Sequence, residues 1–155
     1  MTHDKQITVS RTIDAPAQTI FEILSNPERH AQLDGSGFVR SDEKSNRIQK
    51  VGDVFTMNMS GDHMGGDYQT DNHVTGYSEN ALLAWQTTPA GTEPFGWEWV
   101  WRLEQQGPRQ TLVTHTYDWS KVPDKDILQK VTFPLVKESQ LEDTLATLAE
   151  VSAGS

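Results

Sequence analysis

Apolar and polar residues alternate along the first stretch of the chain and then change to a helical spacing. Residues 6–13 (QITVSRTI) carry apolar side chains on one side, interrupted by a single arginine, which predicts a strand with one mostly apolar face. Asp14-Ala15-Pro16 is typical of a helix start, because proline is favoured at the first helical position and an acid suits the positive end of the helix dipole. Asn26 is the expected N-cap of a second short helix that ends near Leu33.

The middle of the chain favours strands joined by short turns. Alternating patterns of varying strength predict strands in the segments 53–59, 67–79, 81–88, 96–104 and 110–120. Proline and glycine mark turns between several of them. Strands that follow one another through short turns indicate an antiparallel meander.

The last part of the chain returns to a helical spacing. Ser139 to Glu142 has the sequence of a capping box, in which the serine and glutamate side chains satisfy each other's free backbone N–H groups. Leucines at positions 141, 145 and 148 form an apolar stripe, which predicts a helix of about a dozen residues. Residues 124–132 predict a further short helix that Pro134 interrupts. No internal repeat or linker is visible, so we expect one domain over residues 1–155.

Three of the five tryptophans lie at alternate positions of one expected strand. Trp97, Trp99 and Trp101 share a face, and the opposite face carries charged residues that belong in water. The tryptophans are therefore expected to face the interior, with Trp97 at the rim or surface because it is nearest the turn. A row of indole rings suits the wall of an amphipathic pocket, since a buried indole N–H seeks a hydrogen-bond partner.

Composition and charge narrow the classes of partner. The formal net charge is −9 and the sequence pI is about 4.9, which disfavours nucleic acid and anionic membrane surfaces as partners. No uncharged apolar run approaches the roughly 18 residues that a membrane-spanning helix needs, and the N-terminus lacks a signal-peptide pattern. There are no cysteines, so disulfides and thiolate metal sites are excluded. We expect a cytoplasmic monomer or homodimer.

The sequence resembles one known family along nearly its whole length. ITVSRTIDAPAQTIFEILSNPERH, residues 7–30, is similar to the opening of the polyketide cyclase/dehydrase-like branch of the START and birch-pollen-allergen (SRPBCC) superfamily. Ala15-Pro16, Ile20-Phe21 and Asn26-Pro27 occupy the positions of that family's motif. VGDVF, the strand ending in ALLAW and the closing LEDTLATLAEV also look family-like. The chain departs from many relatives after the second helix, where it has LDGSG in place of a tryptophan.

The resemblance implies a fold and a range of functions. The fold is an α+β helix-grip fold, with a curved antiparallel β-sheet wrapped around a C-terminal α-helix and two short helices after the first strand. A hydrophobic cavity often separates the sheet from that helix in the family. Members include aromatic cyclases, lipid carriers and co-chaperone-type regulators.

Candidate ligand-binding residues are those expected to converge on such a cavity. They come from the segments 53–59, 67–79, 97–103 and 113–119: Phe55, Met57, Met59, His73, Trp99, Trp101, Val113, His115 and Tyr117. Aromatic and apolar linings with a few polar groups are typical of small-molecule sites, and methionine gives an adaptable apolar surface.

His115 and Tyr117 are the candidates for catalysis. A histidine among apolar neighbours on a pocket-facing strand is suited to orienting a ligand carbonyl or moving a proton near neutral pH. The alternative is a structural histidine that is hydrogen-bonded to Tyr117 or to the backbone. Asp71, Asn72 and His73, with His63 and Asp67 nearby, have no established ligand spacing, so we expect neither a metal nor a cofactor.

Three functions are consistent with these patterns. The leading hypothesis is a protein that binds a small hydrophobic molecule, such as an aromatic, lipid-like or polyketide-like compound, in an internal cavity. The second is an enzyme of the cyclase or dehydratase type that uses His115 and Tyr117. The third is a co-chaperone-like regulatory module without a ligand, in which the tryptophans form ordinary core.

Overall fold

The strands of the chain form one antiparallel sheet in the computed structural model, which describes residues 6–35, 38–43, 46–61, 65–91, 97–120 and 137–153. In chain order the strands are β1 (Gln6–Ile13), β2 (Val39–Asp42), β3 (Val54–Gly61), β4 (Gly66–Ser78), β5 (Leu82–Pro89), β6 (Glu98–Gly107) and β7 (Gln110–Asp118). The helical elements are α1 (Ala17–Leu24), η1 (Pro27–Arg29), α2 (His30–Leu33) and α4 (Glu138–Ala153).

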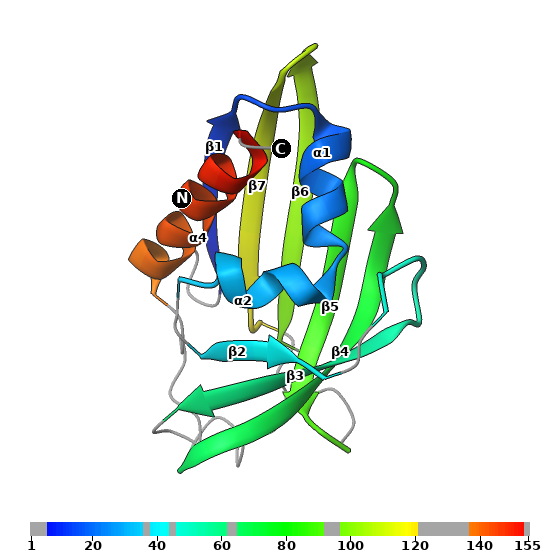
Figure 1. The fold of residues 1–155 in the computed structure, drawn as a ribbon, viewed down its shortest axis with the longest axis vertical. Coiled ribbons are helices and arrows are strands. Elements are labelled where there is room, and N and C mark those ends of the chain that lie inside the picture. The colour runs from blue at the N-terminus through cyan, green and yellow to red at the C-terminus, as the bar shows by residue number, and fades with distance from the viewer. Residues whose placement is uncertain are drawn as a thin grey trace.

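The strand order places the first strand beside the last. The sheet runs β1-β7-β6-β5-β4-β3-β2, so β2 to β7 form a meander and β1 closes against β7 with Ile7 opposite Tyr117. Figure 1 shows α1, α2 and α4 on one face of the curved, open sheet, while β2 and β3 cross its lower end. This arrangement confirms the expected α+β helix-grip fold.

The N-terminal elements follow the sequence signals closely. β1 spans the expected residues, and the Asn26 side chain accepts a hydrogen bond from the Glu28 N–H at 3.2 Å, as an N-cap does. The first helix begins one residue later than expected, because Pro16 has an extended backbone (φ −65°, ψ 150°) and occupies the N-cap. Proline is tolerated there since it has no N–H to leave unpaired.

The C-terminal helix begins earlier than the expected capping box at Ser139 to Glu142, so that prediction is wrong in position. α4 begins at Glu138 and covers 16 residues, so Ser139 already lies inside its first turn. The Gln140 side chain instead accepts a bond from the Lys137 N–H at 2.7 Å, which is the reciprocal half of a capping box placed two residues earlier. The apolar stripe is as predicted, with Leu141, Leu145 and Leu148 all buried.

Two segments differ from or lie beyond the sequence-based expectation. β2 is a four-residue edge strand with an irregular register against β3, and its partly polar sequence, VRSD, has no alternation to predict it. The short helix expected over residues 124–132 lies outside the described residues.

The core fills the space between the helices and the sheet. α1 contributes Ile20, Phe21 and Leu24, which join the leucines of α4 and the apolar side chains of the strands in one buried cluster. Each such side chain contributes about 1.5–3 kcal/mol by leaving water. None of the described helices combines the length and apolar composition needed to cross a membrane.

Gly35 lets the loop after α2 lie directly against α4. A Cβ at this position would overlap the Gln140 carbonyl oxygen and lie 2.9 Å from the Asp143 Cβ. The Gly35 N–H donates to Thr144 Oγ1 at 2.9 Å, so the loop and the helix are bonded as well as packed. Gly35, the first glycine of LDGSG, thus permits a close approach of two backbone segments.

Replacing Gly35 by alanine is expected to lower the free energy of unfolding by about 1–3 kcal/mol, because backbone atoms of α4 must move away from the new methyl group. Urea unfolding followed by circular dichroism measures this change. Gly107→Ala is the matched control, since its Cβ would meet nothing closer than 3.9 Å. Equal losses in the two variants would contradict the proposed close packing.

Candidate functional site

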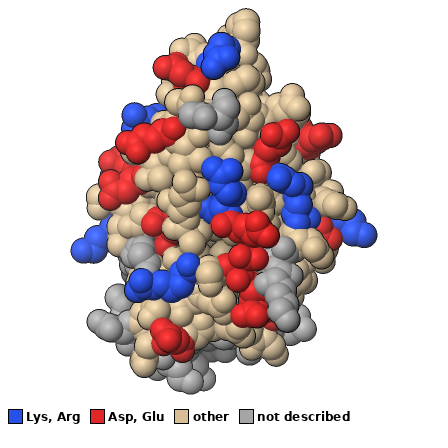
Figure 2. Space-filling view, viewed as in Figure 1, with Lys and Arg blue, Asp and Glu red and all other residues tan. Residues whose placement is uncertain are grey.

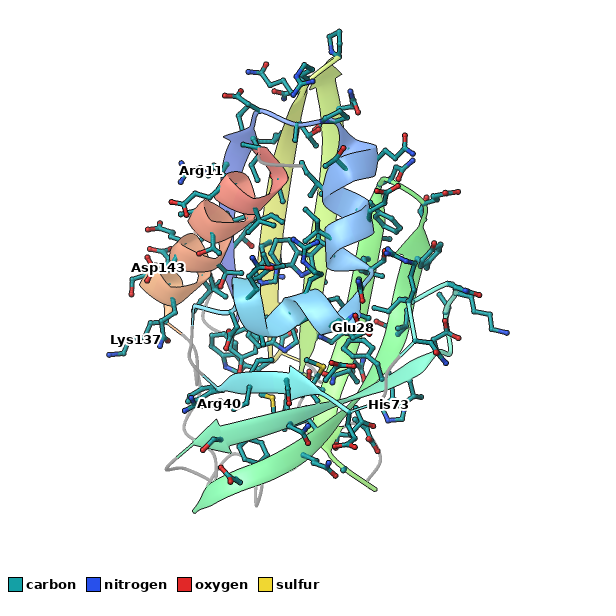
Figure 3. The ribbon with its side chains drawn as sticks, viewed as in Figure 1. Arg11, Glu28, Arg40, His73, Lys137 and Asp143 are labelled. Carbon is teal, nitrogen blue, oxygen red and sulfur yellow. The ribbon has the colours of Figure 1, made fainter. Side chains whose placement is uncertain are left out.

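The sheet face that the helices cover carries rows of cross-strand neighbours, and we call it the inner face. One row joins Ile7, Tyr117, Trp99, Trp85 and Val74 through the registers of β1, β7, β6, β5 and β4. The next row joins Val9, His115, Trp101, Leu83 and Tyr77. Directly opposed side chains in a sheet share a face and touch, so the rows bring aromatic rings of three strands together. Figure 3 shows ring side chains gathered between the helices and the long strands.

Four rings of β6 and β7 form what we call the ring stack: Trp101, His115, Trp99 and Tyr117. The centroids of Trp101 and His115 are 3.6 Å apart with an interplanar angle of 18°. His115 and Trp99 follow at 5.6 Å and 12°, and Trp99 and Tyr117 at 4.2 Å and 11°. The rings alternate between the two strands and are nearly parallel. Trp99 is the partly exposed member, and the others are buried.

His115 is a neutral histidine with a defined tautomer. Its Nδ1 lies 3.2 Å from the Val100 carbonyl oxygen. Because a carbonyl only accepts, Nδ1 carries the proton and Nε2 presents a lone pair. Burial lowers the pKa of His115 from 6.5 to about 3, and the bond to Val100 acts in the opposite direction. A hydrogen bond to the backbone is what the alternative of a structural histidine predicts for this residue.

A second aromatic group, beside the ring stack, joins Phe55 to two rings that were not among the candidate residues, His30 and Trp85. The His30 ring of α2 stacks on Trp85 at 5.2 Å and 15°, and Phe55 meets both rings edge-on. His30 Nε2 donates to the Leu24 carbonyl oxygen at 2.7 Å. Burial lowers the pKa of His30, against opposing effects of that bond and of Asp34 and Asp42. The alternation along residues 81–88 predicts a strand that contains Trp85, whereas no pattern in the sequence indicates a contact of His30 with this strand.

Polar groups interrupt the inner face on β4 and β5. Asn72 is buried and donates from Nδ2 to the Phe55 carbonyl oxygen at 3.1 Å, while its Oδ1 accepts from Thr87 Oγ1 at 2.6 Å. Thr70 is buried beside them, opposite Met57. These side chains satisfy one another, so they act as fixed polar points in an otherwise apolar wall.

Most of the sequence-predicted residues share the inner face. The buried ones are Phe55, Met57, Trp101, Val113, His115 and Tyr117, and the partly buried ones are Met59 and Trp99. His73 stands apart from them (Figure 3). Its neighbours in the strand, Asn72 and Val74, are buried, and its register partner Val54 is 52% exposed, which puts His73 on the opposite face. Trp97, expected at the rim or surface, is buried at 8% exposure.

Two of the side chains weighed as metal ligands, Asp71 and Asn72, have other partners. Asp71 Oδ1 accepts from Thr56 Oγ1 at 2.8 Å, and Asp71 Oδ2 accepts from the Gly91 N–H at 2.9 Å. Asn72 belongs to the buried polar group, and His63 is outside the described residues. Within the described ranges no group of three or more histidine, aspartate or glutamate side chains is placed to hold a metal.

The surface of the molecule offers a polar groove and mixed charge. The groove has a volume of about 550 Å³ and lies between the loop 46–49 and β3, with Arg47 and Asp53 in its lining. Arg47 is engaged there, because its Nη1 donates to the Glu22 carbonyl oxygen at 2.6 Å and to Ser25 Oγ at 3.0 Å. Figure 2 shows acidic and basic side chains interspersed over the face in view, with no basic stripe there of the kind that binds phosphates.

Comparison with known proteins gives one family over most of the chain. The family model for "Activator of Hsp90 ATPase homolog 1-like protein" matches residues 14–152. The uncharacterized protein Rv0088 of Mycobacterium tuberculosis is 36% identical over 113 residues, which are 72% of this chain and 47% of that protein. The chain thus spans about half the length of the curated relatives it matches.

Solved structures give the same fold at low identity. A protein from Arthrobacter aurescens has a TM-score of 0.70 and 14% identity, with 97% of this chain and 87% of that chain covered. The Aha1 dimer from Colwellia psychrerythraea has a TM-score of 0.57 and 20% identity, with 94% of each chain covered. At these identities the likeness shows the fold alone.

Proposed function

The chain belongs to the family of activator of Hsp90 ATPase homolog 1-like proteins, and from this premise we propose that it binds a small, largely hydrophobic molecule against the inner face of the sheet. The family match and the shared fold confirm the START/SRPBCC superfamily expected from the sequence. This family suggests a ligand-binding domain, and the hydrophobic character of the ligand is our proposal. The cytoplasmic location and the monomeric or homodimeric state stay predictions.

The observation that carries the proposal is the ring stack with its partly exposed member. Trp99 lies between two buried rings, Tyr117 at 4.2 Å and His115 at 5.6 Å, yet it keeps accessible surface. Other partly buried apolar side chains border the same core: Phe38, Val39, Met59 and Tyr77. A flat aromatic guest would cover such a surface and gain about 25 cal/mol per Å² of apolar area removed from water.

The protonation state of His115 favours binding over acid catalysis. With a pKa of about 3, the ring is uncharged at neutral pH and has no proton to give from Nε2. Its other nitrogen is already bonded to the Val100 carbonyl oxygen. His115 is therefore better suited to accept a hydrogen bond from a ligand than to drive a reaction. Turnover that disappears in His115→Ala while ligand affinity stays unchanged would instead support the enzyme hypothesis.

A regulatory module that binds another protein is the second candidate. Its support is the description of the family, which names an activator of an ATPase, and the description of one solved relative as a dimer. Recovery of a protein partner at a stoichiometric ratio, with no stabilisation by small molecules, would favour this candidate.

Binding of a hydrophobic guest is tested by thermal unfolding with 2-methylnaphthalene and 2-naphthol. We expect a higher melting temperature, since a ligand at one hundred times its Kd stabilises a protein by about 2.7 kcal/mol. Trp99→Ala should weaken binding about tenfold or more, because it removes an aromatic anchor. Val54→Ala on the opposite face is the control and should bind like the original protein. Unchanged melting temperatures with both compounds would refute the proposal.

A further inference from the structure

Trp101 carries a buried hydrogen-bond donor that the described protein does not use. The residue is 3% exposed, and its Nε1 is enclosed without a hydrogen-bond partner. An indole N–H left unpaired inside a protein costs about 1–3 kcal/mol, and native interiors rarely tolerate it without a reason. The unpaired donor lies in the second cross-strand row, opposite His115 and Leu83.

His115 supplies the matching acceptor. The bond from Nδ1 to the Val100 carbonyl oxygen leaves a lone pair on Nε2, in the plane of the ring. No described residue donates a hydrogen bond to this nitrogen, and the side chain is 3% exposed. Nε2 is thus an acceptor in the same buried row as the Trp101 donor.

The two groups lie together but do not satisfy each other. The centroids of the two rings are 3.6 Å apart and the rings are nearly parallel, at 18°. The Trp101 N–H and the His115 lone pair lie in the planes of their own rings, so each points past the other ring rather than at it. Neither group can therefore bond to the other, and each needs a partner at the edge of the stack.

We infer that this edge receives a single hydroxyl group of the ligand, which accepts from Trp101 Nε1–H and donates to His115 Nε2. A hydroxyl is the smallest group that is both donor and acceptor. An ether or ketone would satisfy Trp101 alone, and a carboxylate would bring a charge into a buried site. The ligand class is therefore a neutral hydroxylated aromatic compound, such as a phenol. This inference rests on the proposed function of the inner face.

Three compounds of similar size distinguish the contribution of the hydroxyl group to the affinity from that of the aromatic ring. They are 2-naphthol, 2-methoxynaphthalene and 2-methylnaphthalene. Calorimetric titration of the unmodified protein should give 2-naphthol an affinity about tenfold or more above that of 2-methylnaphthalene, from two hydrogen bonds. The methoxy compound should lie between them. Equal affinities of all three would overturn the inference and leave the proposed function standing, whereas no binding by any of them would refute both.

Conservative variants assign the preference to the two residues. Trp101→Phe and His115→Phe keep a ring in the stack and remove the donor and the acceptor, respectively. In each variant the ratio of the 2-naphthol affinity to the 2-methylnaphthalene affinity should fall to about threefold or less, and this ratio is the readout whatever the change in the affinity for 2-methylnaphthalene itself. Trp99→Phe is the control and should weaken all three compounds alike. A crystal structure with 2-naphthol whose hydroxyl lies away from both nitrogens, with water between them, would also overturn the inference.

Discussion

Replacing Leu148 by alanine is expected to lower the free energy of unfolding by about 2–5 kcal/mol. Leu148 is completely inaccessible to solvent and belongs to the cluster that joins α4 to α1 and the sheet. Truncation removes apolar contacts and leaves a cavity that rigid neighbours fill only in part. Besides Leu148, the buried apolar side chains of α4 include Leu141 and Leu145. The lost stability therefore comes from the contact that holds the helix to the sheet.

Urea unfolding followed by far-ultraviolet circular dichroism measures this loss. Glu150→Ala is the matched control, because Glu150 lies on the same helix and is exposed. It should change the free energy of unfolding by no more than about 0.5 kcal/mol. Similar losses in the two variants would mean that Leu148 is not an anchor of the helix. The slope of the free energy against urea should stay unchanged in both, since neither alters the surface exposed on unfolding by much.

Acid is expected to destabilise the protein through His115 well before its carboxylates are titrated. In the unfolded chain the histidine takes up a proton near its ordinary pKa of 6.5, whereas burial lowers its folded pKa to about 3. The unfolded state therefore binds more protons between these two values, and stability falls as the pH falls through that window. The expected slope is about 1.4 kcal/mol per pH unit for this one group. Burial also lowers the pKa of His30, so this residue adds a further loss of stability as the pH falls.

The His115→Phe variant isolates this contribution. Urea unfolding at pH 7, 6, 5 and 4.5 gives the free energy of unfolding of each protein. The difference between them should shrink or reverse toward low pH by about 1.4 kcal/mol per unit. Effects of His30 and of the carboxylates are common to both proteins and cancel in the difference. A difference that is independent of pH would show that His115 is not held neutral.

Local patterns predicted most of the fold because strands and helices have their own periods. Alternation placed Phe55 and Met57 on the inner face, and the i, i+4, i+7 spacing placed Leu141, Leu145 and Leu148 toward the sheet. β2 was not predicted, because its four partly polar residues show no alternation of apolar and polar side chains. The capping box was placed two residues late, since Ser139 and Gln140 both suit a first turn and only the contact with Lys137 decides between them.

The candidate site was harder to predict because it depends on register between strands. Stacking of Trp101 on His115 needs β6 and β7 aligned, which no single segment encodes. His73 was grouped with the pocket because the strand over residues 67–79 is polar on both faces, and a pattern of that kind leaves the direction of each side chain weakly specified. The pairing of Asn72 with Phe55 fixes that direction and turns His73 away.

The pairing of β1 with β7 has a consequence for how the chain folds during its synthesis. Ile7 pairs with Tyr117, so the first strand has no partner in the sheet until more than a hundred further residues have been made. At a translation rate of about 5–20 residues per second, that interval is several seconds or longer. The apolar side of β1 is open to wrong partners throughout it, and contacts so distant along the chain also slow folding.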